Sequence, residues 1–167
     1  MITIKNNFLD ETFINNFIQN IIKESQEYKP IWKSNINWGD NIVKGSSLVL
    51  AYEINKENLN YIKSKFIELN DKFKDKEIVG HFYIWTKGSH IPMHNDSNYE
   101  YGCTIYLNKY WDIDWGGLYI WKEGDKLNIE KPEFNKLIIN KGNTKHGTTL
   151  LNYNVPEERL TLQIFFK

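Results

Sequence analysis

The sequence predicts an α+β fold, or a β-sandwich braced by helices, and two features of its pattern carry that prediction. Before residue 76, apolar residues recur every three or four positions, as they do on one face of a helix. After residue 76, short runs rich in β-branched and aromatic residues are separated by turn residues. Because the strands follow the helices instead of alternating with them, a parallel sheet is not expected.

The chain has 167 residues, about the length of one ordinary domain. It contains no internal repeat, no low-complexity tract and no linker rich in Pro, Gly or Ser. We therefore expect a single domain over 1–167, in which a helical region at 1–76 supports a β-rich core at 77–167.

Two helices are expected in the first region. One covers 10–25, where Asp10 is placed to cap the N-terminus. Its apolar residues are Phe13, Phe17, Ile18, Ile21 and Ile22. The other covers 56–74 and should lie along a flat apolar surface, because its apolar residues form one stripe. These residues are Leu59, Ile62, Phe66, Leu69 and Phe73.

The remaining runs predict strands and loops. Residues 28–52 read as a loop that carries Trp32 and Trp38, with a strand at 47–53. Later strands are expected where β-branched and aromatic residues are concentrated between turn residues. These runs are "EIVGHFYIWT" (77–86), "YGCTIYLN" (101–108), "GGLYIW" (116–121), "NKLIIN" (135–140) and "RLTLQIFF" (159–166).

Composition excludes several classes of protein. Lys plus Arg equals Asp plus Glu at 21 each, and no basic stripe is visible, so nucleic acid is not an expected partner. The single cysteine, Cys103, allows no internal disulfide and no cysteine-based zinc site. No stretch approaches the roughly 18 apolar residues of a membrane span, and no secretion signal is expected. We predict a cytoplasmic protein, and the richness in Asn, Lys and Ile is compatible with a bacterial or viral origin.

The run "HIPMHND" at 90–96 is the candidate for chemistry. On an extended segment, side chains two positions apart share a face, so His94 and Asp96 project together. His146 lies 50 residues beyond Asp96, after a predicted strand and among turn-forming residues, where it could supply a third ligand. Two histidines and one carboxylate form the facial triad of non-haem Fe(II) oxygenases, which leaves positions open for a co-substrate and O2.

A second prediction concerns the co-substrate. If it is a dicarboxylic keto acid, its far carboxylate needs a cation, and a guanidinium can pair with it bidentately. The only arginine of the chain, Arg159, opens the last predicted strand, thirteen residues after His146. Arg159, Thr161 and Gln163 share one face of that strand, and such a polar row is expected around a polar ligand.

With these residues in place, most of 77–167 resembles the Fe(II)/2-oxoglutarate-dependent dioxygenases of the prolyl 4-hydroxylase type. The motifs are "HND", the distal histidine, "RLT", and the run "CTIYLNKYWDIDWGGLYIW", in which a Tyr-Leu-Asn run precedes a Gly-Gly turn. That run and "PEFNKLIIN" resemble the oxygen-sensing prolyl hydroxylases most of all. The opening "NNFLDETFINNFI" is similar to the first helix of the family.

The resemblance implies a double-stranded β-helix (jelly-roll) core with the N-terminal helices packed on its major sheet. It implies that His94, Asp96 and His146 hold Fe(II). It also implies that Arg159 binds the distal carboxylate of 2-oxoglutarate, with Thr161 beside it and the hydroxyl of Tyr106 in reach.

One position departs from the family. Its members commonly carry a tyrosine about nine residues before the first ligand, where this chain has Trp85, with Tyr83 two residues earlier on the same face. Tyr83 is then a candidate for co-substrate binding and Trp85 for substrate contact, and either could line the pocket. His81 shares their face, as a hydrogen-bonded barrel residue or a substrate contact.

The implied reaction is hydroxylation of an unactivated C–H bond with release of succinate and CO2, and peptidyl proline is the first expected substrate. A free amino acid or another small metabolite is the alternative. A jelly-roll binding module without turnover is the alternative from a different class. The sequence leaves open the oligomeric state and which divalent metal is bound in the cell.

Overall fold

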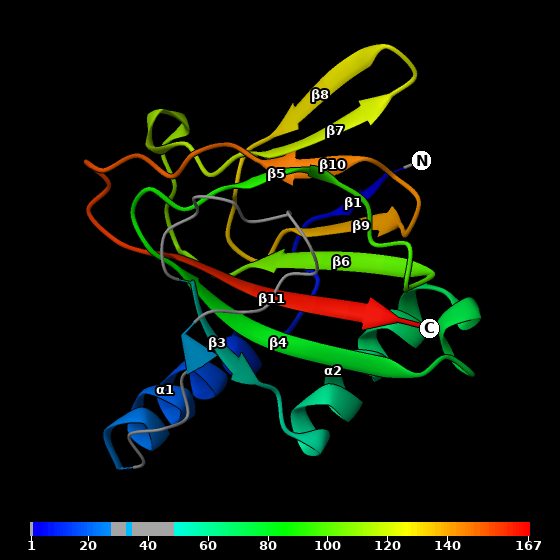
Figure 1. The fold of residues 1–167 in the computed structure, drawn as a ribbon. Coiled ribbons are helices and arrows are strands. Elements are labelled where there is room, and N and C mark those ends of the chain that lie inside the picture. The colour runs from blue at the N-terminus through cyan, green and yellow to red at the C-terminus, as the bar shows by residue number, and fades with distance from the viewer. Residues whose placement is uncertain (1, 28–32, 35–48) are drawn as a thin grey trace.

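The computed structural model describes residues 2–27, 33–34 and 49–167 and places their strands in two antiparallel sheets (Figure 1). The seven-stranded major sheet has the order β1-β9-β6-β11-β4-β3-β2. Its strands are Thr3–Lys5, Leu137–Lys141, Tyr101–Tyr106, Arg159–Phe166, Ile78–Trp85, Val49–Glu53 and Lys33–Ser34. The four-stranded minor sheet has the order β5-β10-β7-β8. Its strands are Ile91–His94, His146–Thr148, Tyr119–Glu123 and Lys126–Glu130.

The strand order is that of a double-stranded β-helix. From β4 to β11 the chain crosses repeatedly between the sheets, and only the hairpin β7–β8 stays in one of them. The major sheet thus contains β4, β6, β9 and β11, while the minor sheet contains β5, β7, β8 and β10. The predicted α+β class with a jelly-roll core is confirmed. Trp32, Trp38 and the first two positions of the strand predicted at 47–53 lie outside the described residues.

Both predicted helices are present and pack on the major sheet, on the side away from the minor sheet (Figure 1). The helix α1 spans Glu11–Glu27, and the carbonyl of Asp10 accepts the N–H of Ile14 at 3.1 Å. Asp10 therefore stands at the N-cap position, but its carboxylate pairs with Tyr61 and Lys65 of α2. Four of the five predicted apolar residues face the core, since Phe17 and Ile21 are buried and Phe13 and Ile18 pack against it. The exceptions are Ile22, which is half exposed, and Ile14, which is buried but was not predicted.

The second helix, α2, spans Lys56–Leu69 and is shorter than predicted. Its N-terminus is capped by Asn55, whose side chain accepts the N–H of Asn58 at 2.9 Å. It ends where Asn70 adopts an extended backbone, and the 3₁₀-helix Asp71–Phe73 (η1) follows. This 3₁₀-helix places Phe73 in the core. The last residue of the predicted apolar stripe is therefore buried by η1 and not by a longer α2.

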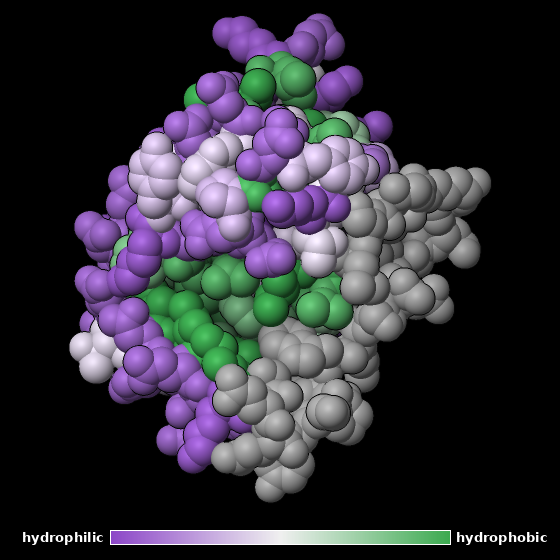
Figure 2. All heavy atoms as spheres, turned by 90° about the vertical axis from the view of Figure 1, so that its left-hand side faces the viewer, coloured by the Kyte–Doolittle hydropathy of each residue, from purple (hydrophilic) through white to green (hydrophobic). Residues whose placement is uncertain are grey.

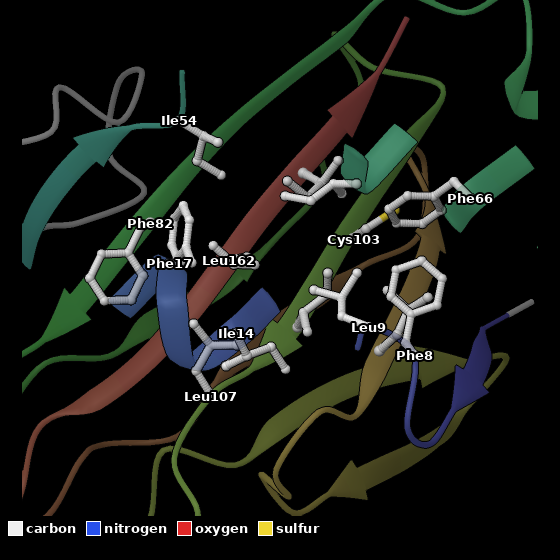
Figure 3. Close-up of a cluster of buried hydrophobic side chains, with 14 of the residues drawn as sticks. Phe8, Leu9, Ile14, Phe17, Ile54, Phe66, Phe82, Cys103, Leu107 and Leu162 are labelled. Atoms are coloured by element: carbon white, nitrogen blue, oxygen red, sulfur yellow. The ribbon is translucent and has the colours of Figure 1, made fainter. Parts of the chain in front are cut away.

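The main core lies between the helices and the major sheet. Figure 3 shows Phe17 of α1, Phe66 of α2 and Leu162 of β11 meeting there with side chains from the neighbouring strands. Period-two alternation places Leu162, with its neighbours Leu160, Ile164 and Phe166, on this face of β11. The opposite face of β11, which carries Arg159, faces the minor sheet.

Five short strands were not predicted: β1, β2, β5, β8 and β10, of which β2 lies where a loop was expected. The hairpin β7–β8 turns through Gly124 and Asp125, and Gly124 has the positive φ of 61° that a two-residue hairpin turn requires. β5 and β10 are only four and three residues long, and they contain Pro, His and Gly in place of alternating apolar residues. Their pairing with each other is nevertheless what forms the site described below.

The loops that join β6 to β7 and β10 to β11 meet at one end of the two sheets, on the left of Figure 1. Gly117 donates to the carbonyl of Leu150 at 3.1 Å, and Asn152 donates to that of Trp115 at 2.9 Å. On the face that Figure 2 shows, hydrophobic side chains gather in a hollow beside the residues drawn in grey. Among the described residues, no helix is long and apolar enough to cross a membrane.

Candidate metal and co-substrate site

Three side chains from the minor sheet and its adjoining loop converge at one point. His94 is the last residue of β5, His146 is the first of β10, and Asp96 follows β5 by two positions. One carboxylate oxygen of Asp96 lies 3.6 Å from Nε2 of His94, and the other lies 3.3 Å from Nε2 of His146. Their potential ligand atoms all lie within 4.8 Å of one another.

Strand pairing explains why the two histidines meet although they are 52 positions apart. β5 and β10 are antiparallel neighbours, and His94 and His146 are register partners. Directly opposed residues have Cβ atoms about 5 Å apart, which fits the ring-centroid separation of 4.3 Å. The minor sheet therefore holds the two imidazoles side by side, and the turn after β5 places Asp96 next to both of them.

Backbone hydrogen bonds fix how the imidazoles are presented. Nδ1 of His94 lies 2.8 Å from the carbonyl of Pro92, and Nδ1 of His146 lies 2.9 Å from that of Thr144. A carbonyl can only accept, so each Nδ1 donates a proton to it, and in the neutral imidazole the Nε2 atom then keeps a lone pair for a metal. Such a hydrogen bond from the other ring nitrogen is usual for histidines that bind a metal.

The carboxylate of Asp96 occupies a gap that a glycine leaves in the major sheet. A Cβ on Gly102 would lie 2.4 Å from Oδ2 of Asp96, so a side chain there would displace the carboxylate. Asn140, the register partner of Gly102, lies beside the same carboxylate, and its Oδ1 accepts the hydroxyl of Tyr119 at 3.1 Å. Asp96 also donates its N–H to the carbonyl of Gly142 at 2.8 Å.

The pKa shifts favour the protonation states that a cation requires. Burial raises the pKa of Asp96, but hydrogen bonding and charge from His146, followed by His94 and Asn140, outweigh it, so the net pKa is lowered. Burial, followed by the neighbouring His146, lowers the pKa of His94. At neutral pH the site is therefore an ionised carboxylate beside a neutral His94 imidazole.

This donor set fits a divalent transition metal. Ligand bonds of about 2.1 Å at right angles place neighbouring donor atoms about 3.0 Å apart. The measured 3.3 and 3.6 Å separations are close to that value. Two imidazoles and one carboxylate on one face of an ion are the ligands of the facial triad, which leaves the other positions open.

A pocket between the two sheets extends from these three residues to Arg159. About 420 Å³ of space that no atom fills lies in it, a volume that includes open solvent. The residues around it, besides the three ligand candidates, are Trp85, Ile91, Thr104, Tyr106, Tyr119, Gly147, Thr148, Arg159, Gln163 and Phe165. Residues of both the minor and the major sheet thus line the pocket.

Arg159 and Tyr106 are buried in this pocket with unused hydrogen-bonding groups. Nη1 of Arg159 donates to the carbonyl of Gly117, but within the described part of the chain its Nε has no partner. The hydroxyl of Tyr106 is likewise buried without a partner among the described residues. Burial lowers the pKa of Arg159 to about 10 and raises that of Tyr106 to about 12. A buried guanidinium without an anion is costly, so this end of the pocket is suited to a carboxylate.

Of the other predicted site residues, Trp85 lies against Arg159 and is bonded to Thr161, whereas Tyr83 and His81 lie further along β4. The ring of Trp85 lies 4.7 Å from the guanidinium, and its Nε1 donates to Oγ1 of Thr161 at 2.9 Å. Trp85 lines the pocket, whereas Tyr83 is not among its described wall residues and packs against Trp85. His81 stacks on Tyr83 at 5.7 Å, one step further along β4.

Sequence reasoning missed the residues that support Asp96. Gly102, Asn140 and Tyr119 each lie in a correctly predicted strand. The contacts of Gly102 and Asn140 with Asp96, and of Tyr119 with Asn140, depend on which strands are neighbours. The local signals were a glycine at the start of an otherwise bulky strand and a polar residue that ends an apolar one. Neither signal identifies a partner by itself.

No protein-family model and no curated protein sequence matches the chain. Solved structures do match it. A Pseudomonas putida prolyl-4-hydroxylase is 16% identical, with a TM-score of 0.76 over 99% of this chain and 91% of that one. A Trichoplax adhaerens prolyl hydroxylase, in complex with a peptide fragment of the oxygen degradation domain of hypoxia inducible factor, is 17% identical, with a TM-score of 0.76 over 99% and 82%.

An oxidoreductase of the 2OG-Fe(II) oxygenase family from Burkholderia pseudomallei is 16% identical, with a TM-score of 0.62 over 99% of this chain and 84% of that one. The predicted resemblance to prolyl 4-hydroxylases and 2OG-Fe(II) oxygenases is therefore confirmed at the level of the fold.

Proposed function

We propose that this protein is an Fe(II)/2-oxoglutarate-dependent dioxygenase that hydroxylates an unactivated C–H bond. The observation that carries the proposal is one pocket with two complementary ends. One end gathers His94, Asp96 and His146 at metal-binding distances. The other end buries Arg159 and Tyr106, each with a hydrogen-bond donor that no described residue accepts from. A dicarboxylic keto acid has the matching chemistry, because its keto acid can chelate a metal while its far carboxylate pairs with a guanidinium.

In this proposal His94, Asp96 and His146 hold Fe(II), which when bound activates O2 and drives the oxidative decarboxylation of 2-oxoglutarate to succinate and CO2. Arg159 binds the distal carboxylate through its guanidinium, whose Nε has no partner among the described residues, and Tyr106 adds its hydroxyl. Trp85 packs against the guanidinium and is held by Thr161, so both residues keep Arg159 in place. This contact supports a place for Trp85 at the co-substrate end, and its contact with the primary substrate stays a prediction.

For the substrate we propose a peptidyl proline. The support is the likeness to two prolyl hydroxylases, one of which was solved with a peptide fragment. The alternative substrate is a free amino acid or another small metabolite, which would need no extended surface outside the pocket. The side chains around the opening of the pocket, and not the metal ligands, then decide which substrate is bound.

The test is production of succinate from 2-oxoglutarate by the Fe(II)-loaded protein, with proline-containing peptides and with metabolite extracts, read by mass spectrometry. We expect a gain of one oxygen atom in one substrate, with succinate formed in equal amount, and no product with His146→Ala. A wild-type protein that binds neither Fe(II) nor 2-oxoglutarate would refute the enzyme class. It would favour a jelly-roll binding module. Turnover on metabolites but not peptides would refute only the peptidyl substrate.

A further inference from the structure

The inner face of β6 and β11 carries a ladder of side chains along the pocket. Three register pairs follow each other: Gly102 with Phe165, Thr104 with Gln163, and Tyr106 with Thr161. Each step of two residues advances about 6.8 Å along a strand. Asp96 lies over Gly102 at one end of the ladder, whereas Arg159 is two residues beyond Thr161 at the other.

Gln163 therefore stands one step from the metal ligands and one step from Tyr106. Thr104 and Gln163 both line the pocket, and their side chains are joined by a hydrogen bond of 3.1 Å from Oγ1 of Thr104 to Oε1 of Gln163. The amide oxygen of Gln163 thus accepts from Thr104, and the N–H groups of Nε2 can donate to a ligand in the pocket.

We propose that Nε2 of Gln163 donates a hydrogen bond to the keto acid end of bound 2-oxoglutarate, and that Thr104 positions this amide. The inference rests on the proposed function, because a dicarboxylate that reaches from the metal ligands to Arg159 has to pass the Thr104–Gln163 pair. Its keto acid end lies on the side of the metal ligands, one ladder step from Gln163.

The charge of the ligand explains why a donor is needed at this position. The keto acid is anionic, so an amide N–H stabilises it, whereas an acceptor aimed at it would repel it. Gln163 has a donor and an acceptor on the same end, and only their orientation decides which of them meets the ligand. In the structure the hydroxyl of Thr104 supports that orientation by donating to Oε1, and Thr104 acts on the co-substrate only through Gln163.

The experiment is calorimetric titration of 2-oxoglutarate, without primary substrate, into protein loaded with redox-stable Mn(II). Gln163→Met keeps the length of the side chain and removes the donor, and we expect its dissociation constant to rise about 10- to 100-fold. Gln163→Glu replaces the donor by a negative acceptor, and it should weaken binding more than Gln163→Met does. Affinity for Mn(II) and the melting temperature of Gln163→Met should stay near those of the wild type.

Thr104 supplies a second pair of variants that does not alter Gln163. Thr104→Val removes the hydroxyl and should weaken 2-oxoglutarate binding several-fold, whereas Thr104→Ser keeps the hydroxyl and should restore it. Wild-type protein that binds 2-oxoglutarate with Gln163→Met and Thr104→Val binding equally well would overturn this inference alone. An effect confined to KM for the primary substrate would also overturn it. Wild-type protein that binds no 2-oxoglutarate would instead refute the proposed function.

Discussion

Gly102 offers a direct test of how Asp96 is held, because its only special feature is the space that it leaves. In Gly102→Ala the new Cβ would start 2.4 Å from Oδ2 of Asp96, and at 3.1 and 3.2 Å from the amide atoms of Asn140. Its φ lies outside the left-handed region, so the backbone accepts alanine without strain. Contacts to a real Cβ are essentially never below 3.0 Å and are ordinary from 3.4 Å, so the carboxylate has to retreat by about 0.6–1.0 Å.

That retreat is large for a metal ligand, whose bond lengths vary by only about 0.2 Å. We therefore expect Gly102→Ala to lower the affinity for Mn(II) or Fe(II) by roughly 10- to 100-fold, as loss of a supporting contact does. The assay is anaerobic calorimetric titration of the metal, with thermal melting measured alongside. Gly124→Ala is the matched control, because its φ of 61° costs about 1 kcal/mol of stability while its Cβ meets nothing within 4 Å. Unchanged metal affinity in folded Gly102→Ala would refute this account of Asp96.

Three further predictions concern co-substrate binding, pH and stability. Tyr106→Phe should leave the melting temperature equal or higher, since it removes an unpartnered buried hydroxyl, while weakening 2-oxoglutarate binding about 10-fold by calorimetry. The metal-free protein should lose free energy of unfolding in urea as the pH falls from 6.5 through the lowered pKa of His94, because the unfolded chain binds that proton more readily. Asn135→Ala should lower the free energy of unfolding by about 3 kcal/mol, since its amide bonds both the N–H and the carbonyl of Leu9 (2.8 and 2.6 Å) at a φ of 57°.

Each of these three predictions has its own control. For Tyr106, a loss of stability without a loss of affinity would show that the hydroxyl serves the fold. For His94, the variant His94→Gln should lack the decline that begins at pH 6.5, whereas Asp96 contributes only below its ordinary pKa of 3.8. A decline of the same size in His94→Gln would contradict the assignment. Asn135→Gly should lose about 1 kcal/mol less than Asn135→Ala, because glycine accepts the left-handed backbone.

The sequence predicted the features that follow from a repeat along the chain, which is two residues in a strand and about 3.6 residues in a helix. Alternation along the last strand placed Arg159 and Gln163 on one face, and helical spacing located both helices. The spacing of His94 and Asp96 placed them together, and the structure brings His146 beside them. On α1 the burial of Ile14 was missed because Phe13 and Ile14 are adjacent apolar residues, and only packing on the sheet decides which of them is buried more deeply.

The features that the sequence could not predict depend on contacts between distant strands. β5 and β10 are too short and too polar to stand out, and they are held as strands by pairing with each other. The gap at Gly102 exists for Asp96 only because β6 lies beneath the turn after β5. Trp85 was expected as a residue that could line the pocket, and it does, but its contact with Arg159 could not be predicted, because it follows from their register across β4 and β11.

The most direct measurement is anomalous diffraction from crystals soaked with Mn(II) and 2-oxoglutarate. The account predicts one strong anomalous peak per chain, bonded to Nε2 of His94, Nε2 of His146 and a carboxylate oxygen of Asp96. It also predicts density for 2-oxoglutarate that runs from this ion past Gln163 to Arg159. A peak at another place, or no peak while the soaked protein stays folded, would contradict it.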